Sequence, residues 1–340
     1  MGNAFVVDFD TNADALGETI VLSAFRMRLS VIRSEEVKRL LNLPITANKV
    51  HAMTNSAANS VSTHITGKTR VFMVAGDPVS QVQAPAIFNR VFQRYGVDAV
   101  LVPVQVSPDR FADFATTVLE AGNIDGLWLT IPHKPKLMPL LAKSDTASQM
   151  ARSVNAVRRH ADGTLEGGMF DGNGLVSSLR YFGIEPKGLR VLLLGTGGAG
   201  AAIATALVEA KVAELGLHDL GDRAEKLAQR LDDPCVTVPG SDPAGFDLVI
   251  NATPLGLNPD DPLPFDVSRL DPKAKVVDIL MKHKPTPLLK ACAERNIQAF
   301  PGFEMLVQQV PDYLRFFGMP EIADKIKDDL SEVREHLLAA

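Results

Sequence analysis

One glycine-rich turn constrains this chain more than any other feature. Residues 191–200 read VLLLGTGGAG: an apolar run with strand character passes through three spaced glycines into an alanine-rich stretch with helical character. In such a G-x-G-x-x-G turn the first glycine permits a tight turn, the second lets backbone N–H groups approach a pyrophosphate, and the third lets the helix pack close to the strand. The helix N-terminus adds partial positive charge. The pattern predicts a dinucleotide site formed by Gly195, Gly197, Gly198, Ala199 and Gly200.

An acidic residue at the end of the next predicted strand indicates which dinucleotide binds. Residues 213–219 read AELGLHD, and Asp219 follows the glycine turn by about twenty residues, where dinucleotide folds place the acid that binds the adenosine ribose. A carboxylate accepts hydrogen bonds from ribose hydroxyls and repels a 2′-phosphate at short range. This predicts NAD, with NADP less favoured. Arg223 could clamp a phosphate, but it lies in DRAEKLAQR, whose charge mix is typical of an exposed helix face.

Composition narrows the class of protein. At 340 residues, with 46% hydrophobic and 22% charged residues, the chain is long enough for two globular domains. A net charge of −5 gives no basic footprint for nucleic acid, and no apolar run reaches the length of a membrane span. Two cysteines imply no disulfide framework, and seven histidines show no metal-ligand spacing. We expect a cytoplasmic protein without a metal; a homodimer is the default oligomer.

Strands alternate with helices from residue 70 onwards, which predicts an α/β fold with parallel sheets. In the first half, strands are expected at 70–76, 97–106 and 124–132, helices at 85–95, 110–121, 136–142 and 144–150, and a hairpin around Asp162-Gly163. In the second half, helices are expected at 171–182 and 286–296 and strands at 246–251, 275–279 and 298–300. The C-terminal helices, 304–317 and 321–338, are expected to fold back on the first half.

This pattern predicts three parts of the chain. Residues 1–66 form an N-terminal extension without a readable role. Residues 67–170 together with 303–340 form a substrate-binding and catalytic domain. Residues 171–302 form a Rossmann domain that binds NAD.

Three polar residues outside the glycine turn are candidates for chemistry. Lys134 follows the third predicted strand, at the sheet edge where open α/β sheets bind ligands, and could move a proton. Asn155 interrupts an apolar strand, and Asp171 opens a helix. Each has an ordinary structural interpretation: a solvated loop lysine, a structural amide and a helix N-cap. Taken singly, none decides between structure and function.

Together with other blocks in the same order, these residues resemble a known family. GDP…P, LTIPHK, SVNA, FDGNG, GTGGAG, NATP-LG and GFEMLVQQ follow one another between residues 71 and 317, as in the shikimate dehydrogenase superfamily. The resemblance implies a catalytic pair, Lys134 and Asp171. It also implies substrate-binding residues Thr130, Asn155 and Gln309, and a turn along the nicotinamide that contains Asn251, Thr253 and Pro254.

The chain departs from that family where a substrate carboxylate is held. Val82 and Ala84 replace two serines, Met281 replaces a tyrosine, Trp128 an asparagine, and Phe170 a small hydroxyl residue. An apolar wall cannot repay the desolvation of a carboxylate. Either the substrate lacks a carboxylate there, or side chains that can donate hydrogen bonds hold it. The candidates for that role are Gln81, Gln83 and His133, whereas the rings of Trp128 and Phe170 form either a floor for a ring-shaped substrate or ordinary core.

The resemblance and these departures lead to one functional expectation and two alternatives. We expect an NAD-dependent oxidoreductase that acts on a hydroxyl or ketone of a small alicyclic polyol or hydroxy acid, with a small molecule as its partner. One alternative is a true shikimate or quinate dehydrogenase with a rearranged carboxylate site. The other is a non-catalytic NAD-binding sensor.

Overall fold

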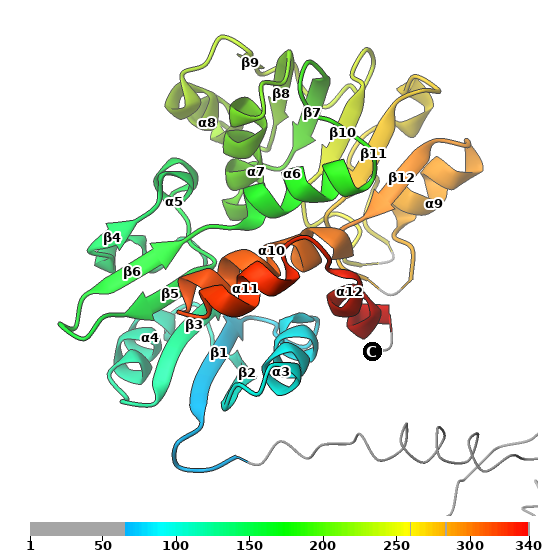
Figure 1. The fold of residues 1–340 in the computed structure, drawn as a ribbon. Helices are drawn as coiled ribbons and strands as arrows, with labels where there is room; N and C mark the ends of the chain where they lie inside the picture. The colour runs from blue at the N-terminus through cyan, green and yellow to red at the C-terminus, as the bar shows by residue number, and fades with distance from the viewer. Residues whose placement is uncertain (1–64, 259, 283, 339–340) are drawn as a thin grey trace, which may run out of the picture. The chain divides into compact units, whose positions relative to one another are not determined.

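The computed structural model describes residues 65–258, 260–282 and 284–338. The N-terminal extension predicted for residues 1–66 therefore lies outside the described residues except for its last two. The described part contains two six-stranded sheets with helices on their faces (Figure 1). This confirms the predicted α/β fold class.

The first sheet has a mixed strand arrangement. Its order is β2-β1-β3-β5-β6-β4. Strand β1 pairs parallel to β2 and β3, whereas β5 runs antiparallel to both β3 and β6. The hairpin expected around Asp162-Gly163 is thus present, and it makes the sheet mixed where a parallel sheet was predicted. The strands are β1 (Arg70–Gly76), β2 (Ala99–Gln105), β3 (Ile124–Leu129), β4 (Lys143–Ser144), β5 (Ala156–Arg159) and β6 (Leu165–Gly168).

Two helices of the first half contribute to separate hydrophobic cores. Helix α3 (Ala84–Arg94) buries apolar side chains at helical spacing, including Phe88 and Phe92, in a core with Phe72 of β1. Helix α4 (Phe111–Leu119) buries Phe111 and Leu119 in a second core with alternate residues of β3. Because successive side chains of a strand point to opposite faces, the two cores lie on opposite faces of the sheet.

The segment after β3 is less helical than its sequence suggests. A helix was predicted for residues 136–142, but the structure has only a short 3₁₀ turn, Met138–Leu140, followed by β4. Pro139 lacks the backbone N–H that a continuous helix needs at this position. Helix α5 (Thr146–Ala151) then begins where Asp145 accepts a hydrogen bond from the backbone N–H of Ser148, at 2.7 Å.

The second sheet is parallel throughout and has the order β12-β11-β10-β7-β8-β9. Its central strands are fully buried apolar runs, as expected for a sheet covered on both faces. The strands are β7 (Arg190–Leu194), β8 (Glu214–His218), β9 (Val236–Thr237), β10 (Leu248–Asn251), β11 (Lys275–Asp278) and β12 (Gln298–Pro301). The helices are α7 (Gly198–Glu209), α8 (Arg223–Leu231) and α9 (Pro287–Glu294).

Helices α6 (Asp171–Tyr181) and α10 (Phe303–Phe316) connect the two sheets. Helix α6 follows β6 and leads into β7, and α10 follows β12 and leads back (Figure 1). The two helices pack closely, because a Cβ on Gly174 of α6 would lie 2.7 Å from the carbonyl oxygen of Met305 in α10. Buried residues of α6 such as Leu175 join the core of the second sheet, and those of α10 such as Val310 join the core that contains Phe72.

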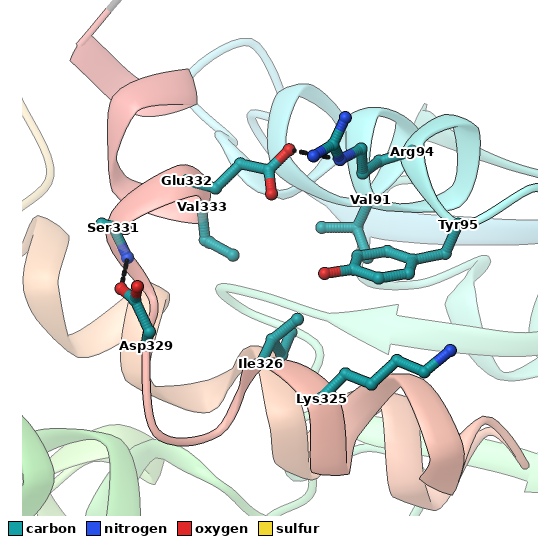
Figure 2. Close-up of a pocket in the computed structure, with 9 residues that line it drawn as sticks. All are labelled: Val91, Arg94, Tyr95, Lys325, Ile326, Asp329, Ser331, Glu332 and Val333. Carbon is teal, nitrogen blue, oxygen red and sulfur yellow. Dashed lines mark hydrogen bonds and ion pairs between the residues drawn. The ribbon is translucent and has the colours of Figure 1, made fainter.

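The C-terminal segment ends in two helices where one was predicted for residues 321–338. They are α11 (Pro320–Ile326) and α12 (Ser331–Leu338). Asp329 lies between them and accepts a hydrogen bond from the backbone N–H of Ser331, at 2.9 Å, which starts a new helix. Figure 2 shows a small cavity of about 200 Å³ among α3, α11 and α12, with the Arg94–Glu332 ion pair at its edge.

Arg334 on α12 contacts both connecting helices. Its guanidinium makes a bidentate ion pair with Glu304 of α10, at 2.7 and 2.8 Å, and lies 4.1 Å from the ring centroid of Tyr181 in α6. Glu304 is only 6% exposed, and its hydrogen bonds raise the pKa of Arg334 above the usual value for arginine.

Candidate active site

The structure brings Lys134 and Asp171 into contact. Lys134 lies in the loop after β3, and Asp171 is the first residue of α6. The Lys134 Nζ donates a hydrogen bond to Asp171 Oδ2, and the two side chains are 15% and 5% exposed. The N-terminus of α6 also favours the negative charge of Asp171. A shielded ammonium and carboxylate in direct contact can hold and deliver a proton.

Two buried amides extend this pair into a network. Asn155 Nδ2 donates to Asp171 Oδ1 at 3.0 Å and to Gln309 Oε1 at 3.3 Å, while Asn155 Oδ1 accepts from the backbone N–H of Phe170 at 3.1 Å. Asn155 and Gln309 are 1% and 2% exposed. A Cβ on Gly174 would lie 2.4 Å from Gln309 Cγ, so glycine there leaves room for the amide. The structure thus gathers four of the predicted site residues from four separate segments.

Tyr313 lies beside this network but is kept neutral. Burial, and secondarily the charge of Asp171, raise the pKa of its phenol well above the usual value. Its hydroxyl donates to the backbone oxygen of Asn155 at 3.3 Å. Tyr313 therefore supports Asn155, and Lys134 is the group in contact with Asp171 that can exchange a proton.

Thr130 directly follows β3, in the same loop as Lys134. Its backbone N–H donates to the carbonyl oxygen of Ala75 at 3.0 Å, and a Cβ on Gly76 would lie 2.5 Å from its methyl group. Thr130 is half-buried. Its substrate-binding role stays a prediction.

His133 does not occupy the position expected of a carboxylate-binding residue. It is fully buried, its ring stacks on Phe111 with 4.0 Å between centroids, and its Nε2 lies 2.8 Å from the backbone oxygen of Val106. Burial lowers the pKa of the imidazole. Its side chain joins the hydrophobic core around α4, and its substrate-binding role stays a prediction.

The two glutamines proposed as donors hold their own loop. Gln83 Nε2 donates to the backbone oxygen of Gln81 at 3.3 Å, and Gln81 Nε2 donates to the backbone oxygen of Pro78 at 2.8 Å. Gln83 is half-buried and directly precedes α3. Its binding role stays a prediction.

Trp128 belongs to the core and forms no floor for a ligand. It is 2% exposed and stacks on Phe317 at 4.1 Å between centroids, with the edges of Phe72 and Phe88 against it. Phe170 differs, because it is half-buried and packs on Tyr313 at 5.0 Å.

The glycine-rich turn leaves open space at Gly197 but none at Gly195 or Gly200. Gly195 has φ +91°, and a Cβ there would lie 2.6 Å from the carbonyl carbon of Ala252. A Cβ on Gly200 would lie 1.9 Å from the oxygen of Gly195, whereas a Cβ on Gly197 would have nothing within 4 Å. Helix α7 begins directly after Gly197, with no side chain capping it. Open space in front of free N–H groups fits the pyrophosphate of a dinucleotide.

Asp219 is hydrogen-bonded to the glycine-rich turn. Its Oδ2 accepts hydrogen bonds from the backbone N–H and the hydroxyl of Thr196, at 2.7 and 2.9 Å, and its Oδ1 accepts from the backbone N–H of Leu220 at 2.6 Å. Arg223 lies 3.7 Å from Asp219 but its side chain is 69% exposed. Such an exposed pair contributes little to stability. The carboxylate is thus fixed at the end of β8.

The turn after β10 is built around a buried amide. Asn251 is fully buried, and its Oδ1 accepts from the hydroxyl of Thr253 at 2.6 Å while its Nδ2 donates to Asp278 at 3.1 Å. Burial raises the pKa of Asp278. Asn251 therefore shapes the turn from within, and the half-buried Thr253 and exposed Pro254 are the members that a ligand can reach.

Ser153 begins the SVNA block, but nothing in the sequence indicates its surroundings. It is 1% exposed, and its hydroxyl has no hydrogen-bond partner among the described residues. A Cβ on Gly198 would lie 2.6 Å from Ser153 Oγ and 3.4 Å from Lys134 Cβ. The first residue of α7 thus touches the segments that carry Lys134 and Asn155.

Among the described residues, no three His, Cys, Asp or Glu side chains gather as metal ligands would. No helix in the same part is long and apolar enough to cross a bilayer.

Comparison with known proteins agrees with this geometry. Residues 74–157 match the family model for the shikimate dehydrogenase substrate binding domain. A shikimate dehydrogenase (NADP(+)) of Rubrobacter xylanophilus is 34% identical over 254 residues, which cover 72% of this chain and 89% of the relative.

Solved structures show the same fold. Quinate dehydrogenase from Corynebacterium glutamicum in complex with NAD is 27% identical with a TM-score of 0.69, covering 80% of this chain and 99% of that one. The ligand-free 5-ketofructose reductase of a Gluconobacter species is 25% identical with a TM-score of 0.65, covering 77% and 100%. Since a relative is matched at this identity over almost nine tenths of its length, the chain belongs to the shikimate/quinate dehydrogenase superfamily.

Proposed function

We propose that this chain is an NAD-dependent dehydrogenase that interconverts a hydroxyl and a ketone on a small, oxygen-rich compound. Members of its superfamily are oxidoreductases that act on CH–OH groups with a nicotinamide dinucleotide, and this chain is one of them. The contact between Lys134 and Asp171, joined to Asn155 and Gln309, carries the proposal. In it, residues 67–170 with 303–340 bind the substrate, and residues 171–302 bind the dinucleotide.

The chain's own residues would move the proton. A bound nicotinamide dinucleotide supplies or accepts the hydride. The Lys134 ammonium donates a proton to the substrate oxygen during reduction, and neutral Lys134 accepts it during oxidation. Asp171 stabilises the charged lysine, while Asn155 holds Asp171 in place through its amide. Gly195, Gly197, Gly198, Ala199 and Gly200 would hold the pyrophosphate, with Thr253 and Pro254 nearer the nicotinamide.

The preference for NAD over NADP rests on Asp219. Its carboxylate is 11% exposed and fixed to the glycine turn, where it would face the adenosine ribose. The Rubrobacter relative is named for NADP(+), whereas the Corynebacterium quinate dehydrogenase was solved with NAD. A fixed carboxylate disfavours a 2′-phosphate, which supports NAD here.

Replacing Asp219 by alanine should reduce the ratio of kcat/KM for NAD to that for NADP by about tenfold or more, because the like-charge repulsion is removed. Asp222→Ala is the matched control, since this carboxylate is 68% exposed and pairs with Lys226. Steady-state kinetics with both dinucleotides measure the ratio. An unchanged ratio in Asp219→Ala would show that Asp219 does not face the ribose.

Apolar residues that pack on the core around Tyr313 support a substrate without a carboxylate. Val82, Phe170 and Met281 are half-buried and pack on the core that contains Tyr313. His133 is buried in another core, and the side chains of Gln81 and Gln83 donate within their own loop. None of these three residues therefore offers a charged partner for a carboxylate. Burying a carboxylate there would be costly. A small alicyclic polyol or ketose fits this wall better than a hydroxy acid, and one structural relative is named for 5-ketofructose.

A substrate panel tests this directly. Cyclitols and ketoses without a carboxylate should give kcat/KM at least about tenfold above shikimate and quinate, because an unpaired buried carboxylate costs more than that factor. NADH absorbance reports turnover. Preference for shikimate or quinate would favour the alternative of a dehydrogenase with a rearranged carboxylate site. NADH binding without turnover of any compound would favour the non-catalytic sensor.

A further inference from the structure

We propose that Ser153 is a dinucleotide-binding residue whose hydroxyl donates a hydrogen bond to a pyrophosphate oxygen at the N-terminus of α7. Ser153 comes from the segment that carries Asn155, not from the glycine-rich turn itself. The inference rests on the proposed function, since it assigns one more contact within the same cofactor site.

The first observation is a buried hydroxyl without a partner. Ser153 is 1% exposed, and its Oγ makes no hydrogen bond to any described residue. Buried polar groups in folded proteins almost always have a partner, so a group without one needs an explanation, which its surroundings must supply.

The second observation is where this hydroxyl lies. A Cβ on Gly198 would sit 2.6 Å from Ser153 Oγ, so the hydroxyl borders the first residue of α7, a helix of 12 residues. No side chain caps that helix, and the position of Gly197 just before it is open. An anion held by the free N–H groups of the first turn therefore lies within reach of the hydroxyl.

The backbone of Ser153 is held on both sides. Its N–H donates to the oxygen of Ser148 at 3.1 Å, and the next N–H, of Val154, donates to the oxygen of Lys134 at 2.9 Å. Arg230 of α8 further ties this region to the second sheet by donating to the oxygen of Met150 at 3.2 Å. The hydroxyl is thus placed in advance, which lowers the entropy lost on binding.

Ser153→Ala in the full chain should raise the Kd for NADH by about ten- to a hundredfold, the effect of one lost hydrogen bond to a charged group. Ser148→Ala is the matched control, because Ser148 is also fully buried with an unpartnered hydroxyl but belongs to α5 itself. NADH fluorescence titration measures Kd without turnover. Competition by ADP-ribose, which has the pyrophosphate but no nicotinamide, should weaken by the same factor.

The outcomes separate the inference from the proposed function. If the unaltered chain does not bind NADH, the proposed function fails. If it binds and Ser153→Ala binds equally well, or Ser148→Ala weakens binding as much, or ADP-ribose is unaffected, the assignment of Ser153 is overturned.

A second pair of variants tests the contact with Gly198 without any cofactor. Gly198→Ala should lower Tm, because its methyl would overlap Ser153 Oγ. The loss should be smaller in the Ser153→Ala background, where the nearest remaining atoms lie 3.4 Å away. Additive losses would show that Ser153 does not border α7.

Discussion

Lys134→Ala should lower kcat by about 10²–10⁴-fold, the usual contribution of a positioned proton donor, and leave the Kd for NADH within about twofold. The reason is that Lys134 Nζ contacts Asp171, and no other described lysine or arginine forms an ion pair with that carboxylate. Because this side chain reaches the proton network, its removal should affect the proton transfer step far more than the binding of the dinucleotide.

Lys136→Ala is the matched control, since Lys136 lies two residues further along the same loop and is exposed. It should keep kcat within about twofold, as expected of a surface substitution. If Lys134→Ala turns over at the normal rate while folded and NADH-bound, the assignment of the proton donor is wrong.

Trp128→Ala should lower the free energy of unfolding by about 3–5 kcal/mol, the range for removing a large buried aromatic side chain. Trp128 is 2% exposed and stacks on Phe317, with Tyr313 at 5.3 Å between centroids. Its removal would leave a cavity beside Tyr313, whose hydroxyl donates to the backbone oxygen of Asn155. Urea unfolding followed by circular dichroism measures the loss.

Trp128→Phe is the informative companion. It keeps an aromatic ring in the stack and removes the buried Nε1–H, which has no partner among the described residues. The loss should fall to about 1.5 kcal/mol or less, and KM for the substrate should not change. A large rise in KM with unchanged stability would restore the interpretation of Trp128 as a floor for the substrate.

The sequence predicts the fold well because its signals are local. The glycine turn joins a buried strand to a helix, and its first and last glycines have a steric reason, as the close approach of Gly200 to the Gly195 oxygen shows. The secondary-structure prediction is wrong where the local sequence pattern and the rest of the structure favour different elements. The stretch 136–142 has apolar residues at helical spacing, but Pro139 leaves only a 3₁₀ turn.

The site is predictable in part. The residues around Lys134, Asn155, Asp171 and Gln309 are found from ordered blocks, but their roles stay predictions. The orientation of His133 could not be predicted, because adjacent loop residues point to opposite sides and only the position of Phe111 shows which side is core. Ser153 lies in the SVNA block, but the sequence does not indicate its contact with Gly198, 45 residues further along the chain.

The helices that connect the sheets have a mechanical consequence. The polypeptide passes between the sheets only through α6 and α10 within the described residues, and Arg334 fastens these helices at Glu304 and Tyr181. Any swing of one sheet relative to the other would therefore pivot about this helix pair. Asp171 and Gln309 belong to these two helices and would move least, so their distance from each other would be kept during such a motion.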